Sequence, residues 1–275
     1  MHNVTAGGID IPTLGFGTWP SVGQECFDIV RQALDVGYRH LDTAAFYNNE
    51  TEVGAALKAS GVRRGDVFLT TKVWKDRLAP ADVEASIEES LQKLGTDYVD
   101  LFLIHWPNRD IPLDGTMAAM NRALERGQTR AIGVCNFTAA SFDLAQSLSK
   151  APLAVDQVEY HPLVTQNRVT AAVRRHGAAL TAFCPLARGK VIGNPVLDDI
   201  ARSRGLDLGQ IVLRWLIQQP QVIAIPKSST PARIASNFDV FGFELSPAEM
   251  ARIDALRRPD GRVVTVQPDY PWDVE

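Results

Sequence analysis

Short runs of apolar and β-branched residues alternate with amphipathic stretches along most of the chain, from residue 37 to residue 245. Several runs are apolar almost throughout, which is typical of parallel strands whose two faces are both covered. These runs predict eight strands, at residues 38–44, 67–74, 98–106, 129–137, 154–162, 179–186, 222–228 and 240–245.

The stretches between the apolar runs have the spacing of helices with one apolar face. Residues 80–94 carry the fullest signals, since Pro80 stands in the opening turn, acidic residues come early and Gly95 follows the end. Helices are predicted at residues 25–36, 50–60, 80–94, 114–126, 139–149, 167–176, 207–219 and 231–238. Strict strand–helix alternation implies right-handed parallel crossovers, and eight of them imply an α/β fold closed into a (β/α)₈ TIM barrel.

Two segments fall outside this repeat. Residues 3–19 are predicted to form a short β-hairpin, with Gly7 and Gly8 at its turn, that plugs the floor of the barrel. Residues 246–257 are predicted to form an extra C-terminal helix, followed by a Pro-rich tail. Because no linker or low-complexity segment divides the chain, residues 1–275 are predicted to be a single domain.

Charge and composition narrow the possible partners. The 275 residues carry a formal net charge of −4 with scattered basic side chains, which argues against a nucleic-acid surface. No stretch approaches the roughly 18 apolar residues of a membrane helix, and the N-terminus lacks the features of a signal peptide. The three distant cysteines and five histidines show no metal spacing. We therefore expect a cytoplasmic monomer that acts on a small molecule without a metal.

Four chemically reactive side chains fall at the predicted mouth of the barrel, where TIM barrels place their active sites. Asp42 ends the first strand, Tyr47 lies in the loop after it, Lys72 lies near the end of the second, and His105 ends the third. Three of these side chains have an ordinary explanation when each is considered separately: Asp42 as a turn cap, Tyr47 as a half-buried aromatic, and His105 as a hydrogen-bonded structural histidine. Lys72 is a cation inside an apolar strand, and it requires a partner or a depressed pKa.

Together, the four side chains form a predicted proton-delivery site. A free phenol has a pKa near 10 and is a reluctant donor at neutral pH. An ammonium ~4 Å from the Tyr47 oxygen would stabilise the phenolate by up to ~4 kcal/mol, which predicts a pKa lowered by as much as ~3 units. Asp42 would keep Lys72 charged, and His105 would orient the substrate oxygen while Tyr47 protonates it.

The motifs GYRHLDTAAFYNNE, TTKVW, YVDLFLIHWP, IGVCNF, QVEYHP and AIPKSS together resemble the aldo-keto reductases, in the same order and over nearly the whole chain. The resemblance implies a catalytic tetrad of Asp42, Tyr47, Lys72 and His105. It also implies hydride transfer from NADPH to a carbonyl compound.

The end of the seventh predicted strand supplies a candidate phosphate site in place of a GxGxxG loop, which the chain lacks. Lys227, Ser228 and Arg233 offer the donors that an adenosine 2′-phosphate requires; a solvated basic helix start is the alternative. The resemblance implies NADPH selection here and adenine contact at Asn237. It also implies carboxamide contacts at Asn136 and Gln157 and stacking of Phe183 on the nicotinamide, with core packing as the alternative for Phe183 and Cys135. The predicted cofactor-binding residues are Cys135, Asn136, Gln157, Phe183, Leu186, Lys227, Ser228, Ser229, Arg233 and Asn237.

Four aromatic residues, Trp19, Phe46, Trp74 and Trp106, are predicted to wall an apolar cleft around the substrate carbonyl, with core packing as the alternative. The loop after residue 106 and the tail after residue 257 are short, which favours an open site for a small polar substrate. The chain is similar in this respect to bacterial 2,5-diketo-D-gluconate reductases of the B type. That similarity implies keto sugar acids and small aldehydes such as methylglyoxal as substrates.

Two other functions fit part of the pattern. The chain could be a non-catalytic, NADPH-binding regulatory barrel, although the complete tetrad favours catalysis. It could also be an unrelated barrel enzyme that uses the Lys227–Arg233 end as a clamp for a phosphorylated metabolite.

Overall fold

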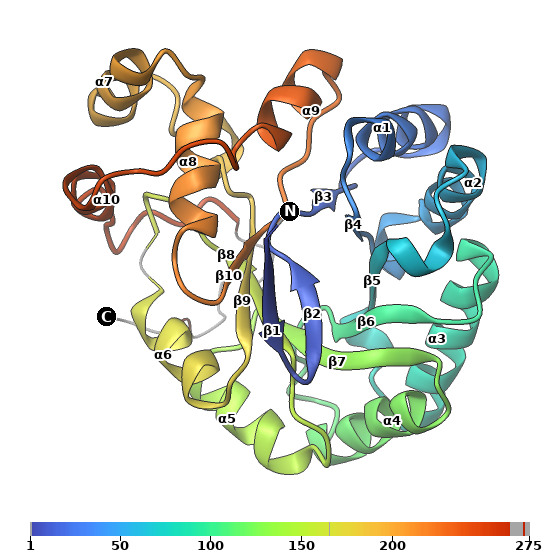
Figure 1. Cartoon of the computed structure of the whole chain (residues 1–275). Coiled ribbons are helices and arrows are strands. Elements are labelled where there is room, and N and C mark those ends of the chain that lie inside the picture. Colours follow the sequence, from blue (N-terminus) through green and yellow to red (C-terminus); the bar gives the residue numbers. More distant parts are fainter. Residues whose placement is uncertain (1, 165, 265–271, 273–275) are drawn as a thin grey trace.

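The computed structural model describes residues 2–164, 166–264 and 272 of the chain and shows eight parallel strands curled into a barrel (Figure 1). Along the sheet each strand pairs with its sequence neighbours, and the barrel closes where Leu14 forms a parallel bridge to Ala224. The strands are β3 (Phe16–Gly17), β4 (His40–Asp42), β5 (Phe68–Val73), β6 (Val99–Ile104), β7 (Thr129–Cys135), β8 (Val155–Glu159), β9 (Ala179–Phe183) and β10 (Val222–Ala224).

Helices surround this barrel on the outside (Figure 1). Local sequence signals begin and end them: in the helix that starts at Pro80, the proline occupies the first turn and Gly95 adopts the left-handed conformation, with φ of 63°, just beyond the end. The helices are α1 (Gly23–Val36), α2 (Glu50–Ser60), α3 (Pro80–Leu94), α4 (Leu113–Glu125), α5 (Ala139–Leu148), α6 (Asn167–Arg175), α7 (Pro195–Arg204), α8 (Leu208–Ile217), α9 (Pro231–Phe238) and α10 (Pro247–Asp254).

The strand pleat divides the buried side chains into two sets. Leu69, Phe102 and Ile104 belong to the large core between the strands and the helices, whereas Phe68 and Leu103 belong to a smaller core inside the barrel. Successive residues of a strand point to opposite faces, so every second residue of each strand faces the barrel interior. This alternation decides which polar side chains reach the site.

The hairpin predicted within residues 3–19 is present as the antiparallel pair β1 (Asn3–Ala6) and β2 (Ile9–Pro12), and it lies across the centre of the barrel in Figure 1. Ala6 and Ile11 are buried with the inner core residues. At the turn, Gly7 has φ of 57°, and a Cβ there would lie 2.7 Å from Ala154. The hairpin therefore closes the barrel at the N-terminal ends of its strands, as predicted.

One predicted strand is wrong, and one helix was not predicted. The eighth strand is β3, near the start of the chain, and residues 240–245 form no strand. Side chains in α8 and just beyond its end bind the backbone there instead: Arg214 donates to the Val240 carbonyl at 3.4 Å, and Gln218 donates to the Leu245 carbonyl at 2.8 Å. Helix α7 was not predicted, although Asn194 caps its first turn through its side chain and Pro195 begins it.

The extra C-terminal helix is confirmed as α10, which begins with a capping box formed by Ser246 and Glu249. Most of the tail predicted after it, residues 265–271 and 273–275, lies outside the described residues. Among the residues that the structure describes, no helix is long and apolar enough to cross a membrane.

Candidate active site

Asp42 and Lys72 meet inside the barrel because both occupy inward-facing positions of neighbouring strands, β4 and β5. The Lys72 ammonium donates to the Asp42 carboxylate at 2.6 Å and to the Thr43 carbonyl at 2.8 Å. The side chains are 0% and 2% exposed, respectively, so water does not screen the pair. Gln157 donates to the second Asp42 oxygen at 2.7 Å. Both oxygens of the carboxylate are therefore held, and they hold the lysine in turn.

Tyr47 reaches the same place from a short 3₁₀ turn after β4, Ala45–Tyr47. Its hydroxyl oxygen lies 3.4 Å from the Lys72 nitrogen. The His105 ring, at the end of β6, stands edge-on to the Tyr47 ring with centroids 5.4 Å apart. The structure thus brings together all four residues of the predicted tetrad, from three consecutive strand ends.

Burial changes the acidity of Tyr47 in the direction opposite to the one predicted. Burial raises the pKa of Tyr47 to about 12, and the neighbouring Lys72 ammonium offsets only part of this rise. The prediction of a lowered pKa omitted the cost of placing a phenolate away from water. Tyr47 is accordingly a protonated phenol at neutral pH, with a cation beside the oxygen on which charge develops when the proton leaves.

Lys72 and His105 of the tetrad have well-defined charge states. Burial is the largest single influence and opposes the charge on Lys72, but the Asp42 carboxylate together with Tyr47 and Cys135 outweighs it and raises the pKa of that lysine. Burial, together with the Lys72 charge, holds the pKa of His105 well below its ordinary value. His105 is therefore neutral, and its Nδ1 atom is buried without a hydrogen bond from the described residues.

The residues expected at the nicotinamide ring lie next to the tetrad. Asn136 adopts a left-handed conformation, with φ of 63°, and donates to the His105 carbonyl at 3.0 Å. Its Oδ1 atom is buried and accepts no hydrogen bond from the described residues, which fits an acceptor for a carboxamide NH₂ group. Cys135 is buried beside it, and burial raises the pKa of its thiol, which stays neutral.

Two further expected cofactor residues follow from β8 and β9. Gln157 uses its amide NH₂ for Asp42, so its role in the described structure is to orient the tetrad. Phe183 is half-buried at the end of β9, at an inward-facing position, and Leu186 is half-buried just beyond it. Both lie where the strand ends open toward the barrel mouth.

The residues expected at the adenosine end gather around the start of α9. Lys227 donates to the Ser229 hydroxyl at 2.6 Å, and the Ser228 hydroxyl accepts from the Thr230 amide at 3.0 Å. Arg233 is exposed and forms no ion pair with the described residues, so its guanidinium is available to an anion. On the inner side of α9, Asn237 is buried, and Gly209 is close enough that a Cβ would lie 3.1 Å from its Oδ1 atom.

Three of the four aromatic residues predicted at the substrate cleft form a wall beside the tetrad. The Phe46 ring stacks on Trp74 with centroids 3.8 Å apart, and Trp19 lies 5.0 Å from the Tyr47 ring. Trp19 and Phe46 are 46% and 43% exposed, which is unusual for large apolar side chains. The fourth residue, Trp106, is buried, and its ring centroid lies 5.8 Å from that of Trp272 in the tail.

Residues that the sequence did not indicate complete the site. Thr43 holds Lys72 through its carbonyl, and its hydroxyl donates to Asn49 at 2.6 Å. Asn49 is fully buried and also donates to the Ser21 carbonyl at 2.8 Å, which ties the Trp19 loop to the tetrad. Glu25 contacts Ser229 and Lys227. None of these has a distinctive charge pattern or spacing in the sequence, since their roles arise from contacts between different loops.

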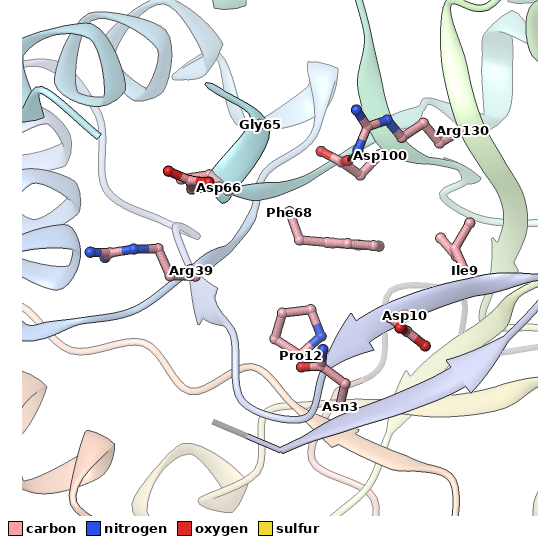
Figure 2. A pocket seen from close by; sticks show the side chains of 11 residues that line it. Asn3, Ile9, Asp10, Pro12, Arg39, Gly65, Asp66, Phe68, Asp100 and Arg130 are labelled. Atoms are coloured by element: carbon pink, nitrogen blue, oxygen red, sulfur yellow. Dashed lines mark hydrogen bonds and ion pairs between the residues drawn. The ribbon is translucent and has the colours of Figure 1, made fainter. Parts of the chain in front are cut away.

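A hollow of about 550 Å³ lies beside the hairpin, at the end of the barrel opposite to the tetrad (Figure 2). Figure 2 shows the Phe68 ring at its centre, with Asp100 and Arg130 side by side at one edge. Arg64 and Arg130 both form ion pairs with Asp100, at 2.8 and 3.1 Å. Asp100 is thus already paired with two arginines, and the hollow lies at the end of the barrel that stabilises the fold in such proteins.

The fold agrees with comparisons against known proteins. The model of the Aldo/keto reductase family matches residues 13–258, so the chain belongs to the aldo/keto reductase family. The glyoxal reductase of Bacillus subtilis is 39% identical over 261 residues, which cover 94% of this chain and 92% of that protein.

Two solved structures extend this comparison. A structure provisionally assigned as a 2,5-diketo-D-gluconic acid reductase B is 46% identical, with a TM-score of 0.97, covering 100% of this chain and 98% of that chain. An aldo-keto reductase of Bombyx mori in complex with NADP is 34% identical, with a TM-score of 0.89, covering 98% and 97% of the two chains.

Proposed function

We propose that this oxidoreductase transfers hydride from NADPH to the carbonyl carbon of small aldehydes and keto sugar acids, as a single barrel domain. The observation that carries the proposal is the buried contact of Lys72 with both Asp42 and Tyr47, next to a neutral His105. The relatives named above, a glyoxal reductase and a diketogluconic acid reductase B, support the substrate class. The half-exposed Trp19 and Phe46 favour a cleft open to small substrates.

The four residues divide the proton chemistry between them. Neutral His105 hydrogen-bonds the substrate oxygen and fixes the direction of the carbonyl. Bound NADPH supplies the hydride that adds to the carbonyl carbon. Tyr47 donates its hydroxyl proton to the oxygen as negative charge develops there, and the phenolate left behind is stabilised by Lys72, 3.4 Å away. Asp42 keeps Lys72 protonated and in position throughout.

The cofactor site fits this proposal at both ends. Asn136 would accept a hydrogen bond from the carboxamide through its Oδ1 atom, which has no partner among the described residues. Lys227, Ser228, Ser229 and Arg233 would hold the 2′-phosphate, and Asn237 would contact the adenine. Aldo-keto reductases that share this fold have been crystallised with NADPH and with NADP, which supports the choice of cofactor.

Replacement of the Tyr47 hydroxyl tests the function directly. We expect Tyr47→Phe to lower kcat with methylglyoxal and 2,5-diketo-D-gluconate by about 10²-fold or more, because general-acid catalysis contributes about that much. Binding of NADPH, followed by tryptophan fluorescence, should remain nearly unchanged. Equal turnover in the variant and the parent would refute the mechanism. A parent that binds NADPH but reduces no carbonyl compound in a broad panel would favour the non-catalytic regulatory barrel.

A further inference from the structure

Glu25, in the first turn of α1, lies against the residues proposed to hold the 2′-phosphate of NADPH. Its Oε1 atom accepts hydrogen bonds from the Ser229 and Ser21 hydroxyls and lies 3.7 Å from the Lys227 ammonium. Lys227 also donates to the Ser229 hydroxyl at 2.6 Å. A carboxylate therefore occupies one side of a site that otherwise offers donors and positive charge.

The two carboxylate oxygens of Glu25 are used unequally. All the contacts with Ser21, Ser229 and Lys227 are made by Oε1. No hydrogen bond from the described residues reaches Oε2, and the side chain is 55% exposed. The carboxylate is thus fixed at one oxygen while the other remains available to a ligand. These contacts also hold the pKa of Glu25 below its ordinary value, with the Ser229 hydrogen bond as the largest cause, so the charge persists at neutral pH.

A carboxylate beside the adenosine ribose favours NADH, whereas a cluster of cations there favours NADPH. Nucleotide sites elsewhere bind the 2′-hydroxyl of NADH through an acidic side chain and the 2′-phosphate of NADPH through arginine. This chain brings both groups to one place, since Glu25 lies 3.7 Å from the Lys227 ammonium, and the exposed Arg233 follows near the start of α9. Glu25 would accept a hydrogen bond from a ribose hydroxyl, and it would repel a phosphate.

We propose that Glu25 is a specificity-determining residue that admits NADH to the cofactor site and weakens the preference for NADPH. This inference rests on the proposed function, because it takes the Lys227–Arg233 end as the ribose site. The Ser229 hydroxyl is shared between the two nucleotides: it donates to Glu25 when the ribose carries a hydroxyl, and turns to the phosphate when the ribose carries one.

Glu25→Gln tests the inference, since it removes the charge and keeps the shape. We expect the Kd for NADPH and for 2′,5′-ADP to fall about three- to tenfold, because a like charge near the phosphate is gone. The Kd for NADH and for 5′-ADP should rise about threefold or more, because a charge-assisted hydrogen bond becomes a neutral one. Calorimetry with the two ADP nucleotides measures these shifts without turnover, and fluorescence titration measures them with the complete cofactors.

Asp28→Asn is the matched control, because Asp28 is an exposed carboxylate on the same helix that contacts Gln24 and not the cluster. It should leave the NADPH-to-NADH ratio of Kd unchanged. The effect of Glu25→Gln on NADPH should also shrink at 0.5 M salt, where the Debye length is only about 4 Å. A uniform weakening of both cofactors, or an unchanged ratio, would overturn the inference and leave the proposed function intact. A parent enzyme that binds neither NADPH nor 2′,5′-ADP would refute the proposed function itself.

Discussion

The buried pair of Lys72 and Asp42 allows stability and catalysis to be separated by experiment. Replacing Lys72 with Met keeps an unbranched chain of similar volume and removes the ammonium. Among the described residues, the Asp42 carboxylate, 2% exposed, would then retain only Gln157 as a side-chain partner. Removal of one partner from a buried ion pair costs about 3–5 kcal/mol, because an uncompensated charge stays away from water. We expect Lys72→Met to lower the free energy of unfolding by that amount.

The double variant Asp42→Asn with Lys72→Met removes both charges and should recover most of this stability, to within about 1–2 kcal/mol of the parent. Activity should not recover with it. The ammonium lies 3.4 Å from the Tyr47 oxygen, and at an effective dielectric constant of 20 this gives an upper bound of about 5 kcal/mol for phenolate stabilisation. About half of that bound corresponds to a hundredfold loss in kcat/KM.

Urea unfolding of the two variants and the parent measures the first effect, and steady-state kinetics with methylglyoxal measures the second. Asp42→Asn alone completes the double-mutant cycle and gives the coupling between the two side chains. A double variant that regains stability and also regains turnover would show that the Lys72 charge does not act on Tyr47. A stability loss well below 1 kcal/mol in Lys72→Met would show that the pair is not buried in solution.

The acidity of Tyr47 and the role of Arg233 give two further tests. Tyr47 donates its proton only while it is protonated, and its pKa is raised to about 12. The rate of carbonyl reduction should therefore show no loss from ionisation of Tyr47 between pH 6 and about pH 10. A fall in that rate through pH 7–8 that Tyr47→Phe abolishes would contradict this. Alcohol oxidation requires the phenolate and should rise with pH over the same range. Arg233→Ala should raise the KM for NADPH far more than that for NADH, because the guanidinium is free to pair with the 2′-phosphate; equal changes would remove Arg233 from that site.

The parts of the fold that could be predicted from sequence are those with strong local signals. Residues 99–104 form a strand within the predicted run, and residues 80–94 form a helix with the predicted ends. Strand β3 could not be detected, because two residues give no periodicity, and it is recognised only by its pairing with β4. Residues 240–245 have the composition of a strand, but backbone groups at both ends of the segment pair with the side chains of Arg214 and Gln218, a tertiary contact that no local pattern reveals.

In the candidate site, too, some residues could be predicted from the sequence and others could not. The positions of Asp42 and Lys72 could be predicted, because strand alternation and the ordering of the strands bring both to the barrel mouth. Glu25 and Asn49 could not, because Glu25 acts on Ser229 and Asn49 on the Ser21 carbonyl, and both partners are distant in sequence. The pKa of Tyr47 was predicted in the wrong direction for a related reason. Its distance to Lys72 could be anticipated, whereas the loss of water around its ring depends on aromatic residues such as Trp19 that pack beside it.

The raised pKa of Tyr47 is compatible with catalysis, because the same burial that raises it also strengthens the effect of Lys72. Removing water from the site destabilises a phenolate, yet it lowers the local dielectric constant through which the ammonium acts at 3.4 Å. A protonated phenol is the form that reduction requires, and an alcohol is a still weaker acid than a phenol with a pKa of about 12. Proton transfer to the developing alkoxide therefore remains favourable, and Lys72 contributes most when charge reaches the Tyr47 oxygen. Catalysis at this site thus depends on charge stabilisation during proton transfer, and a resting phenol that is already acidic is not required.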